Sequence, residues 1–203
     1  MHLLRGLDIA PRIEQLGRFR LAIFREYPYL YDGDLEYERR YLGRYPRSAE
    51  SLLAFLEDAR GLVGACTAIP LKDEDPEFQQ PFRGEALADF FYIGEILLRP
   101  EARGQGLGTR LLARVIERID AAGYPTTVLC TVERGPQHPS RPDGYVPPDA
   151  LWRKFGFVPD AHRVVRYRWQ DLGDARETEK PMRVWTRARA GRRAGERERS
   201  AVG

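Results

Sequence analysis

A glycine-rich turn near the middle of the chain has the chemistry to hold an anion. It contains, in order, Arg103, Gly104, Gln105, Gly106, Leu107, Gly108 and Thr109. The first N–H groups of a helix have no partner inside the helix, and the helix dipole favours a negative charge beside them. Glycine lets such amides approach a ligand with no Cβ in the way. If a helix begins here, the turn predicts a phosphate cradle.

Two elements must position this turn. Residues 90–98 form an apolar run that is typical of a buried strand, and Pro100 then prevents further strand pairing. Apolar side chains recur every three or four residues over 107–119, which predicts an amphipathic helix. This strand–turn–helix setting favours a ligand site over a glycine turn with a purely structural role.

The spacing of the glycines excludes two common phosphate motifs. A mononucleotide P-loop ends in Gly-Lys-Ser/Thr, but Gly108 is followed by Thr109 and Arg110. A dinucleotide fingerprint needs a third glycine where Thr109 stands. The turn instead resembles the Arg/Gln-x-x-Gly-x-Gly/Ala signature of the GCN5-related N-acetyltransferase (GNAT) superfamily, which it matches at Arg103, Gly106 and Gly108.

Further segments carry the same resemblance, which covers roughly residues 8–188. Residues 150–157 resemble the short helix and Gly-Phe ending of GNAT motif B, about fifty residues after the glycine turn. Gly156 suits the left-handed position that ends a helix, and Phe157 is expected to pack on the core. Residues 24–33 resemble a bacterial GNAT subgroup of unassigned substrate.

The resemblance implies an α/β GNAT fold, which is a single mixed, mostly antiparallel sheet with splayed central parallel strands flanked by helices. One domain then spans residues 1–188. We expect helices at residues 9–24, 35–45 (capped by Asp34), 107–119 and 148–155, and strands at 51–57, 62–70, 90–98, 126–133, 157–169 and 181–187. Residues 71–89 and 134–147 are expected to be polar loops.

The resemblance also implies direct transfer of an acetyl group from acetyl-CoA to an amine. In the family, the pantetheine pairs with the exposed edge of a splayed strand, a position that here falls on Ile96, Leu97 and Leu98. A backbone amide near Leu98 would face the thioester carbonyl, and residues 104–109 would hold the pyrophosphate. Arg103 or Arg110 would reach the 3′-phosphate of CoA, unless they lie on a solvated helix face.

Three residues are candidates for proton transfer. Glu95 is a lone carboxylate in an apolar strand and suits a general base, although it would equally fit a surface position or an ion pair with an arginine. His138 is the second candidate base, because the unperturbed pKa of histidine suits neutral pH. Trp152 stands where many GNATs have a tyrosine that protonates the CoA thiolate, so the acid would be Tyr145 or water.

The acceptor site should be built by residues 25–33, 71–89 and 134–147. Tyr27, Tyr29 and Tyr31 would line its wall or pack over the sheet, and the acidic residues of 71–89 would attract a cationic amine. The leading interpretation is an N-acetyltransferase that acts on a primary amine of a small molecule. The alternatives are a protein N-terminus or lysine as the acceptor, and an acyl-CoA-binding module without turnover.

The net charge of +3 comes from the end of the chain. Residues 187–203 hold six arginines and two glutamates, so the rest of the chain has a charge of −1. We expect the basic tail at residues 189–203 to be disordered. It has no interleaved aromatic residues, so nucleic acid is not expected as a partner.

The remaining composition predicts a cytoplasmic protein, either a monomer or a homodimer. Cys66 and Cys130 lie in expected strands and are predicted to be buried thiols rather than a disulfide. No group of Cys and His residues has metal-ligand spacing, so no metal is expected. No segment is apolar enough to span a bilayer, and the start of the chain lacks a signal-peptide core.

Overall fold

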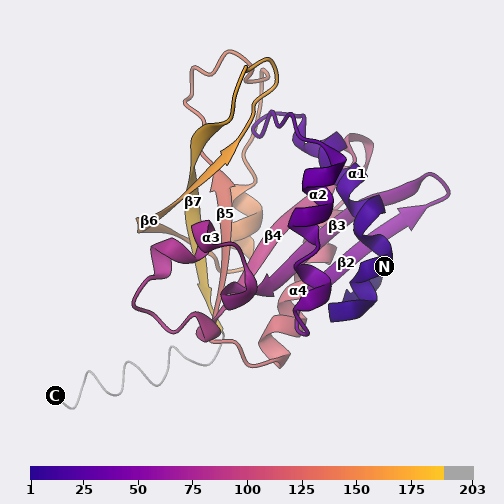
Figure 1. Ribbon diagram of the computed structural model, residues 1–203, viewed down its shortest axis with the longest axis vertical. Helices are drawn as coiled ribbons and strands as arrows, with labels where there is room; N and C mark the ends of the chain where they lie inside the picture. Colours follow the sequence, from indigo (N-terminus) through magenta and orange to yellow (C-terminus); the bar gives the residue numbers. More distant parts are fainter. Residues whose placement is uncertain (190–203) are drawn as a thin grey trace.

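The computed structural model describes residues 1–189, which form one mixed sheet with helices on both faces (Figure 1). Seven strands lie in the order β1-β2-β3-β4-β5-β7-β6. Their bounds are β1 His2–Arg5, β2 Leu52–Asp58, β3 Gly61–Pro70, β4 Phe90–Leu98, β5 Thr126–Val132, β6 Val158–Trp169 and β7 Thr178–Ala188. β4 and β5 pair in parallel, whereas the other neighbours are antiparallel. The expected mixed, mostly antiparallel sheet with central parallel strands is confirmed.

Helices cover the two faces unequally (Figure 1). The front face carries α1 (Ile13–Phe24), α2 (Leu35–Leu42) and α3 (Pro76–Gln79), and the back face carries α4 (Leu107–Ala121) and α5 (Asp149–Lys154). Short 3-10 turns lie at Gly6–Arg12, Tyr45–Arg47, Leu71–Asp73, Gln80–Phe82, Leu87–Asp89 and Pro100–Ala102. Within residues 1–189, no helix is long and apolar enough to cross a membrane.

Each face of the sheet buries its own core. On the back, the predicted apolar stripe of α4 is buried against the sheet together with Phe157 and Trp185. The stripe consists of Leu111, Leu112, Val115, Ile116 and Ile119. On the front, the core beneath α1, α2 and α3 is rich in aromatic rings, including Phe78, Tyr92 and Trp169. The front core can therefore present aromatic faces to a ligand.

Several predicted boundaries are confirmed and others shift for local reasons. The Asp34 side chain accepts the Tyr37 N–H at 2.9 Å and begins α2, as expected for a cap. Gly156 has a φ of +82° directly after α5, as its predicted left-handed role requires. The first α-helix begins at Ile13 rather than at residue 9, because Pro11 has no N–H to donate and lies in a 3-10 turn instead.

Three further differences separate the structure from the prediction. β1 pairs with β2 at the edge of the sheet, although residues 2–5 are too short to show a period. Residues 71–89 were expected to be a polar loop, but they contain α3 and three 3-10 turns, and Phe78 and Phe82 anchor them in the front core. The second helix ends at Leu42, before the expected residue 45.

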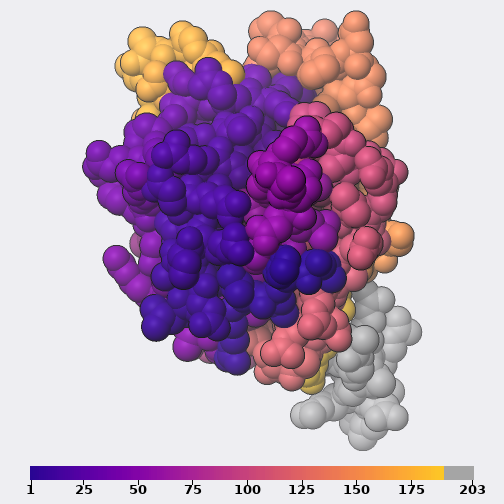
Figure 2. All heavy atoms as spheres, turned by 90° about the vertical axis from the view of Figure 1, so that its right-hand side faces the viewer, coloured from indigo at the N-terminus to yellow at the C-terminus, as the bar shows by residue number. Residues whose placement is uncertain are grey.

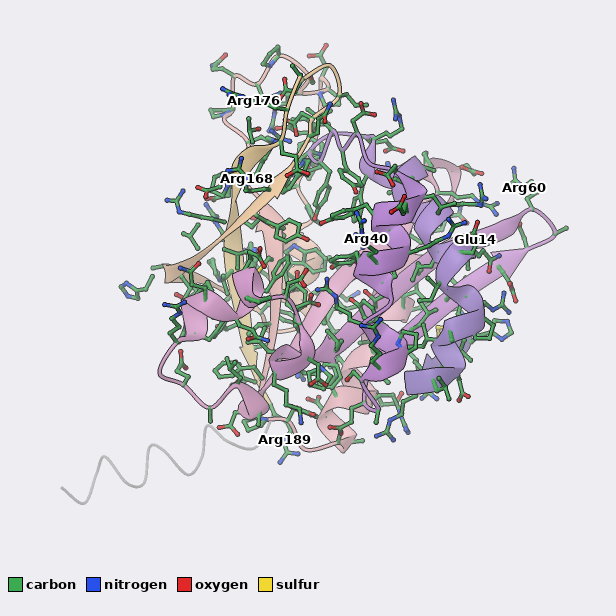
Figure 3. The ribbon with its side chains drawn as sticks, viewed as in Figure 1. Glu14, Arg40, Arg60, Arg168, Arg176 and Arg189 are labelled. Carbon is green, nitrogen blue, oxygen red and sulfur yellow. The ribbon has the colours of Figure 1, made fainter. Side chains whose placement is uncertain are left out.

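The expected basic tail lies outside the described residues from residue 190 onward. Arg189 belongs to the folded part, because its N–H donates to the Pro125 carbonyl at 3.0 Å. Its guanidinium also donates to the Asp120 carbonyl at 3.1 Å. In Figure 3, Arg189 lies at the lower end of the molecule.

Three connections meet at the opposite end, at the top of Figures 1 and 2, where Figure 3 labels Arg176. They are residues 25–34, 133–148 and 170–177. Arg134 joins all three, because its guanidinium donates to the Pro28 and Tyr29 carbonyls and to both carboxylate oxygens of Asp171. This clamp fixes the loops above the ends of β4 and β5.

Candidate active site

A cavity opens where the two parallel strands separate. Residues 90–93 of β4 pair with residues 126–129 of β5, and the pairing stops there. Beyond that point lies a cavity of about 290 Å³, which we name the splay cavity. Its walls include residues 93–96 of β4, residues 129–132 of β5 and Trp152 of α5. The separation of the strands therefore provides space and unpaired backbone in the middle of the sheet.

A β-bulge turns Glu95 toward the front face. Glu95 pairs with Thr67 of β3 and Ile93 with Ala68, so Gly94 is the extra residue in β4. A Cβ on Gly94 would lie 2.5 Å from the Tyr45 Oη and 2.8 Å from the Thr67 Oγ1. Only glycine fits this position, and the bulge places the Glu95 side chain on the same face as Thr67.

Glu95 belongs to a buried cluster of three charged side chains. The Arg20 guanidinium on α1 donates through Nη1 to Glu95 Oε2 and through Nε to Glu38 Oε2 on α2. All three side chains are at least nine-tenths buried. The ion pair with an arginine is thus present. Within residues 1–189, however, the Oε1 atom of Glu95 is buried and has no hydrogen-bond partner.

Electrostatics hold the arginine in its charged form. Burial alone would lower the pKa of Arg20, but the carboxyl groups of Glu95 and Glu38 outweigh it and raise this pKa well above its usual value. The guanidinium also stacks on aromatic rings, 4.8 Å from the centroid of Phe24 and 4.4 Å from that of Tyr41. With two carboxyl groups and one guanidinium, the cluster has a formal charge of −1.

A second, smaller cavity lies on the front side of Glu95. Its volume is about 60 Å³, and we name it the aromatic cavity because nine aromatic side chains line it. These are Phe24, Tyr29, Tyr31, Tyr37, Tyr41, Phe78, Tyr92, Tyr167 and Trp169. Glu95 and Gly94 line both cavities, as do Phe24 and Tyr29. Glu95 therefore stands in the wall between the splay cavity and the aromatic cavity.

The glycine turn forms an open cradle at the start of α4. Gly104 and Gly106 have φ values of +74° and +75°, and no heavy atom of the described chain lies within 4 Å of where their Cβ atoms would stand. Gly108 packs more closely, with its Cβ position 3.4 Å from Leu98 Cδ1. The free N–H groups of Leu107 and its neighbours at the helix start are thus open to an anion.

The other residues of the predicted CoA site do not all face the splay cavity. Ile96 lines the splay cavity, whereas Leu97 is buried. The carbonyl of Leu98 accepts hydrogen bonds from the guanidinium of Arg103, which also donates to Glu26 at 2.7 Å. Gln105, for its part, donates to the Glu101 carbonyl. The turn is therefore braced by its own polar side chains.

The candidate acid Tyr145 lies in the wall of the splay cavity. Burial, and then the neighbouring Tyr27, raise the pKa of Tyr145 above its usual value, so its hydroxyl keeps its proton at neutral pH. The rings of Tyr27 and Tyr145 meet edge to face at 4.7 Å. The His138 ring is tilted by 55° against that of Tyr27, with the centroids 5.8 Å apart, and His138 is not among the residues of the described chain that line either cavity.

Two further side chains in the splay cavity bear on the chemistry. The indole N–H of Trp152 is buried and has no acceptor among residues 1–189. Trp185 lines the same cavity, but its N–H donates to the Thr131 hydroxyl at 3.0 Å. Cys130 also lines it, and burial raises the pKa of this thiol, so it is not a thiolate nucleophile at neutral pH.

Arg20 and Glu38 are site residues that the sequence analysis missed. Arg20 falls on the buried stripe of α1, four residues after Leu16 and four before Phe24. Glu38 lies three residues before the buried Tyr41 on α2. A charged residue on an otherwise apolar stripe indicates a buried ion pair, so this signal was present in the sequence.

Comparisons with known proteins give a consistent result. A family model described as the acetyltransferase (GNAT) family matches residues 18–157. No curated protein sequence matches the chain.

Several solved structures share the fold. The ribosomal-protein-alanine N-acetyltransferase of Brucella melitensis is 17% identical, with a TM-score of 0.60 over 93% of this chain and 99% of that one. A GCN5-related N-acetyltransferase from Kribbella flavida is 18% identical, with a TM-score of 0.55 over 92% and 96%. A spermidine N-acetyltransferase chimera that includes the Vibrio cholerae protein is 14% identical, with a TM-score of 0.53 over 94% and 97%.

At these identities the structures show the common fold alone. The family model, in contrast, spans more than half of the chain and includes α4, the glycine turn and the separated strands. The chain therefore belongs to the GNAT family of acetyltransferases.

Proposed function

We propose that this N-acetyltransferase transfers an acetyl group directly from acetyl-CoA to a primary amine of a small molecule. The observation that carries the proposal is the position of Glu95 Oε1, which has no hydrogen-bond partner within residues 1–189. Glu95 stands in the wall between the splay cavity and the aromatic cavity. An amine on one side and a thioester on the other would meet at this carboxylate. Members of the GNAT family use acetyl-CoA, and the open cradle at residues 104–109 fits a pyrophosphate.

The proposed roles follow from the walls of the splay cavity. Residues 94–96 line the cavity and Leu98 does not, so we assign the thioester carbonyl to backbone N–H groups of 94–96 rather than to that of Leu98. Such a donor stabilises the developing oxyanion and contributes about 10²–10³ in rate. Glu95 Oε1 takes a proton from the amine, whose nitrogen forms the new bond to the acetyl carbon.

The carbon–sulfur bond breaks as the tetrahedral intermediate collapses. Tyr145 donates its proton to the leaving sulfur and regains one from the nitrogen of the intermediate. The indole N–H of Trp152 donates a hydrogen bond to the sulfur. The place of Tyr145 in the wall of the splay cavity and the missing acceptor for Trp152 within the described chain support these two roles. Direct transfer is favoured over an acyl-enzyme intermediate, because burial keeps the Cys130 thiol protonated.

A small acceptor is favoured over a protein because three loops cover the end of the sheet. Arg134 clamps residues 25–34 to the β6–β7 turn at this end of the sheet, and it also lines the splay cavity. A thiol-release assay separates this proposal from the two alternatives, which are a protein acceptor and acyl-CoA binding without turnover.

The test is a thiol-release assay with acetyl-CoA and matched panels of small amines and peptides. We expect release above background with small amines, and loss of release in Glu95→Gln at pH 7. Acetylation of peptides alone would support a protein acceptor. Calorimetric binding of acetyl-CoA with no turnover of any amine would contradict the proposal and support a binding module.

A further inference from the structure

Three features of the aromatic cavity would select among amines, and the inference drawn from them rests on the proposed function of the same site. The first feature is charge. Arg20 is shared by Glu38 and Glu95, so the cluster lacks one positive charge. A buried carboxylate oxygen without a donor is costly, and Glu95 Oε1 has none within the described residues. A primary ammonium supplies both the missing charge and up to three N–H donors.

The second feature is the chemistry of the walls. Aromatic faces attract cations through their negative quadrupole. Burial raises the pKa of Tyr29 and of Tyr41, so these rings are neutral phenols that add no charge of their own. Among the described residues that line the cavity, the charged ones are Glu95 and Arg20 of the carboxyl cluster, whose formal charge is −1. An ammonium would enter nitrogen first.

The third feature is size. A volume of about 60 Å³ is less than half of the roughly 150 Å³ of a cavity that holds benzene. This is room for an ammonium group and a methylene, but not for a branch on the carbon that bears the nitrogen. A carboxylate on that carbon would also meet a cluster whose formal charge is already −1.

From these three features we infer that the aromatic cavity is a recognition site for unbranched primary alkylammonium ions. It accepts R–CH₂–NH₃⁺ groups and excludes α-branched amines, α-amino acids and peptide N-termini with a side chain. The rest of the acceptor extends away from Glu95 toward solvent. Glu38 acts as a positioning residue for charge, because it is paired with Arg20 and does not line the aromatic cavity.

Three probes of equal carbon number test this selection: n-butylamine, sec-butylamine and 2-aminobutyrate. We expect kcat/KM for n-butylamine to exceed that for sec-butylamine by about 10- to 200-fold, the range for one misplaced carbon in a tight pocket. Turnover of 2-aminobutyrate should be lower still. Equal kcat/KM values for the three compounds would overturn the inference.

Two variants separate the steric cause from the electrostatic one. Phe78 of α3 lines the aromatic cavity, so Phe78→Leu enlarges the cavity and should raise the turnover of sec-butylamine. Misfolding cannot produce such a gain. Glu38→Gln should raise KM for n-butylamine with little change in acetyl-CoA affinity. Its control is Glu36→Gln, two residues earlier on α2, where the exposed carboxylate pairs with Arg40 (labelled in Figure 3). An unchanged KM in Glu38→Gln would contradict the role of the cluster charge.

Calorimetry with the same amines in the presence of CoA distinguishes this inference from the proposed function. Selective binding of n-butylamine without acetylation would leave the recognition site standing and reject the transferase activity. Acetylation of all three amines at similar rates would support the transferase activity and reject the recognition site. A failure of n-butylamine both to bind and to react would overturn the inference.

Discussion

Arg20 of α1 and Glu95 of β4 lie 75 positions apart in the chain and form a buried ion pair at the wall between two cavities. The pair leaves one carboxylate oxygen of Glu95 without a partner in the described chain, while Glu38 shares the same guanidinium. The arginine thus fixes the position of the carboxylate without satisfying it. A carboxylate held in this way is oriented before any amine arrives, as a general base requires.

The cluster should be a major source of stability for the front face. Arg20→Met leaves two buried carboxyl groups without a cation, which we expect to cost about 3–5 kcal/mol in the free energy of unfolding. Urea unfolding measures this value. Arg18→Met is the control, because Arg18 is exposed on the same helix and, among the described residues, pairs with Glu14 one turn earlier. A loss below about 1 kcal/mol for Arg20→Met would show that the cluster is solvated.

The Arg134 clamp should make the protein lose stability as the pH falls into the acid range. Burial opposes the charged form of Asp171, but hydrogen bonds from Arg134 and Lys180 outweigh it and hold the pKa of Asp171 below its ordinary value. A lowered pKa contributes stability that is present above the unfolded pKa, about 3.9, and that is lost as pH falls through the folded pKa. Asp171→Asn should therefore lower Tm at pH 7. The difference in Tm between this variant and the parent protein should become smaller toward pH 3.

Asp174→Asn is the matched control for this clamp. Asp174 lies in the same turn, and its side chain is exposed. Its substitution should leave the dependence of Tm on pH unchanged. If Asp171→Asn and Asp174→Asn gave the same profile, the clamp would not be the group that titrates.

The sequence predicted the parts of this architecture that depend on local order. The stripe of α4, the Asp34 cap and the left-handed Gly156 each follow from spacing or from one residue's conformational preference. The bulge at Gly94 could not be predicted, because the register of β4 depends on contacts with Tyr45 and Thr67 that lie far away in the chain.

The candidate site divides in the same way. Glu95 and the glycine turn stood out in the sequence because a lone carboxylate and clustered glycines are local signals. Arg20 lies 75 residues from Glu95 and 18 residues from Glu38, and only the packing of α1 and α2 on the sheet brings the three side chains together. The meeting of two cavities at one carboxylate likewise depends on tertiary structure.

Glu95→Gln should affect turnover through the protonation state of the amine. An alkyl amine with a pKa near 10.4 is mostly protonated at pH 7, so loss of a base should lower kcat/KM by about 10²–10⁴ there. The deficit should shrink toward pH 10, where more free amine is present. A pH–rate profile with acetyl-CoA affinity measured in parallel tests this expectation.

A matched control for Glu95 lies in the same cavity. Glu133 also lines the splay cavity, but it is more exposed and pairs with Arg183. Glu133→Gln should leave the shape of the pH profile unchanged. Equal turnover of Glu95→Gln and the parent at pH 7 would remove Glu95 as the base, and a matching loss of acetyl-CoA affinity would make the residue structural.

Gly106→Val should weaken acetyl-CoA binding by at least about tenfold. Its φ of +75° strains a β-branched residue, and the new side chain would stand over amides whose charge-assisted hydrogen bonds are each worth about 1.5–3 kcal/mol. Gly123→Val is the control, because Gly123 has a similar φ of +89° at the opposite end of α4. Calorimetry should show a loss of affinity in the first variant only, and equal losses would point to general destabilisation.

Trp152 should set the ionisation of the CoA thiol that remains after transfer. Its buried N–H has no acceptor in residues 1–189, and a hydrogen bond from it would favour a thiolate over a thiol. Trp152→Phe keeps a large ring but removes the donor, so the pKa of enzyme-bound CoA should rise. A hydrogen bond to a charged group is worth about 1.5–3 kcal/mol, which corresponds to about one to two pH units.

Ultraviolet absorbance of the thiolate during a pH titration of the CoA complex measures this shift directly. Trp185→Phe is a close control, because it removes an indole N–H from the same cavity whose acceptor is already Thr131. The control should leave the bound thiol unchanged even if it costs stability. Trp152→Tyr restores a donor that can also release its proton, so its turnover should at least equal that of the parent. An unshifted thiol pKa in Trp152→Phe would show that the indole serves only as packing and would leave protonation of the leaving group to Tyr145.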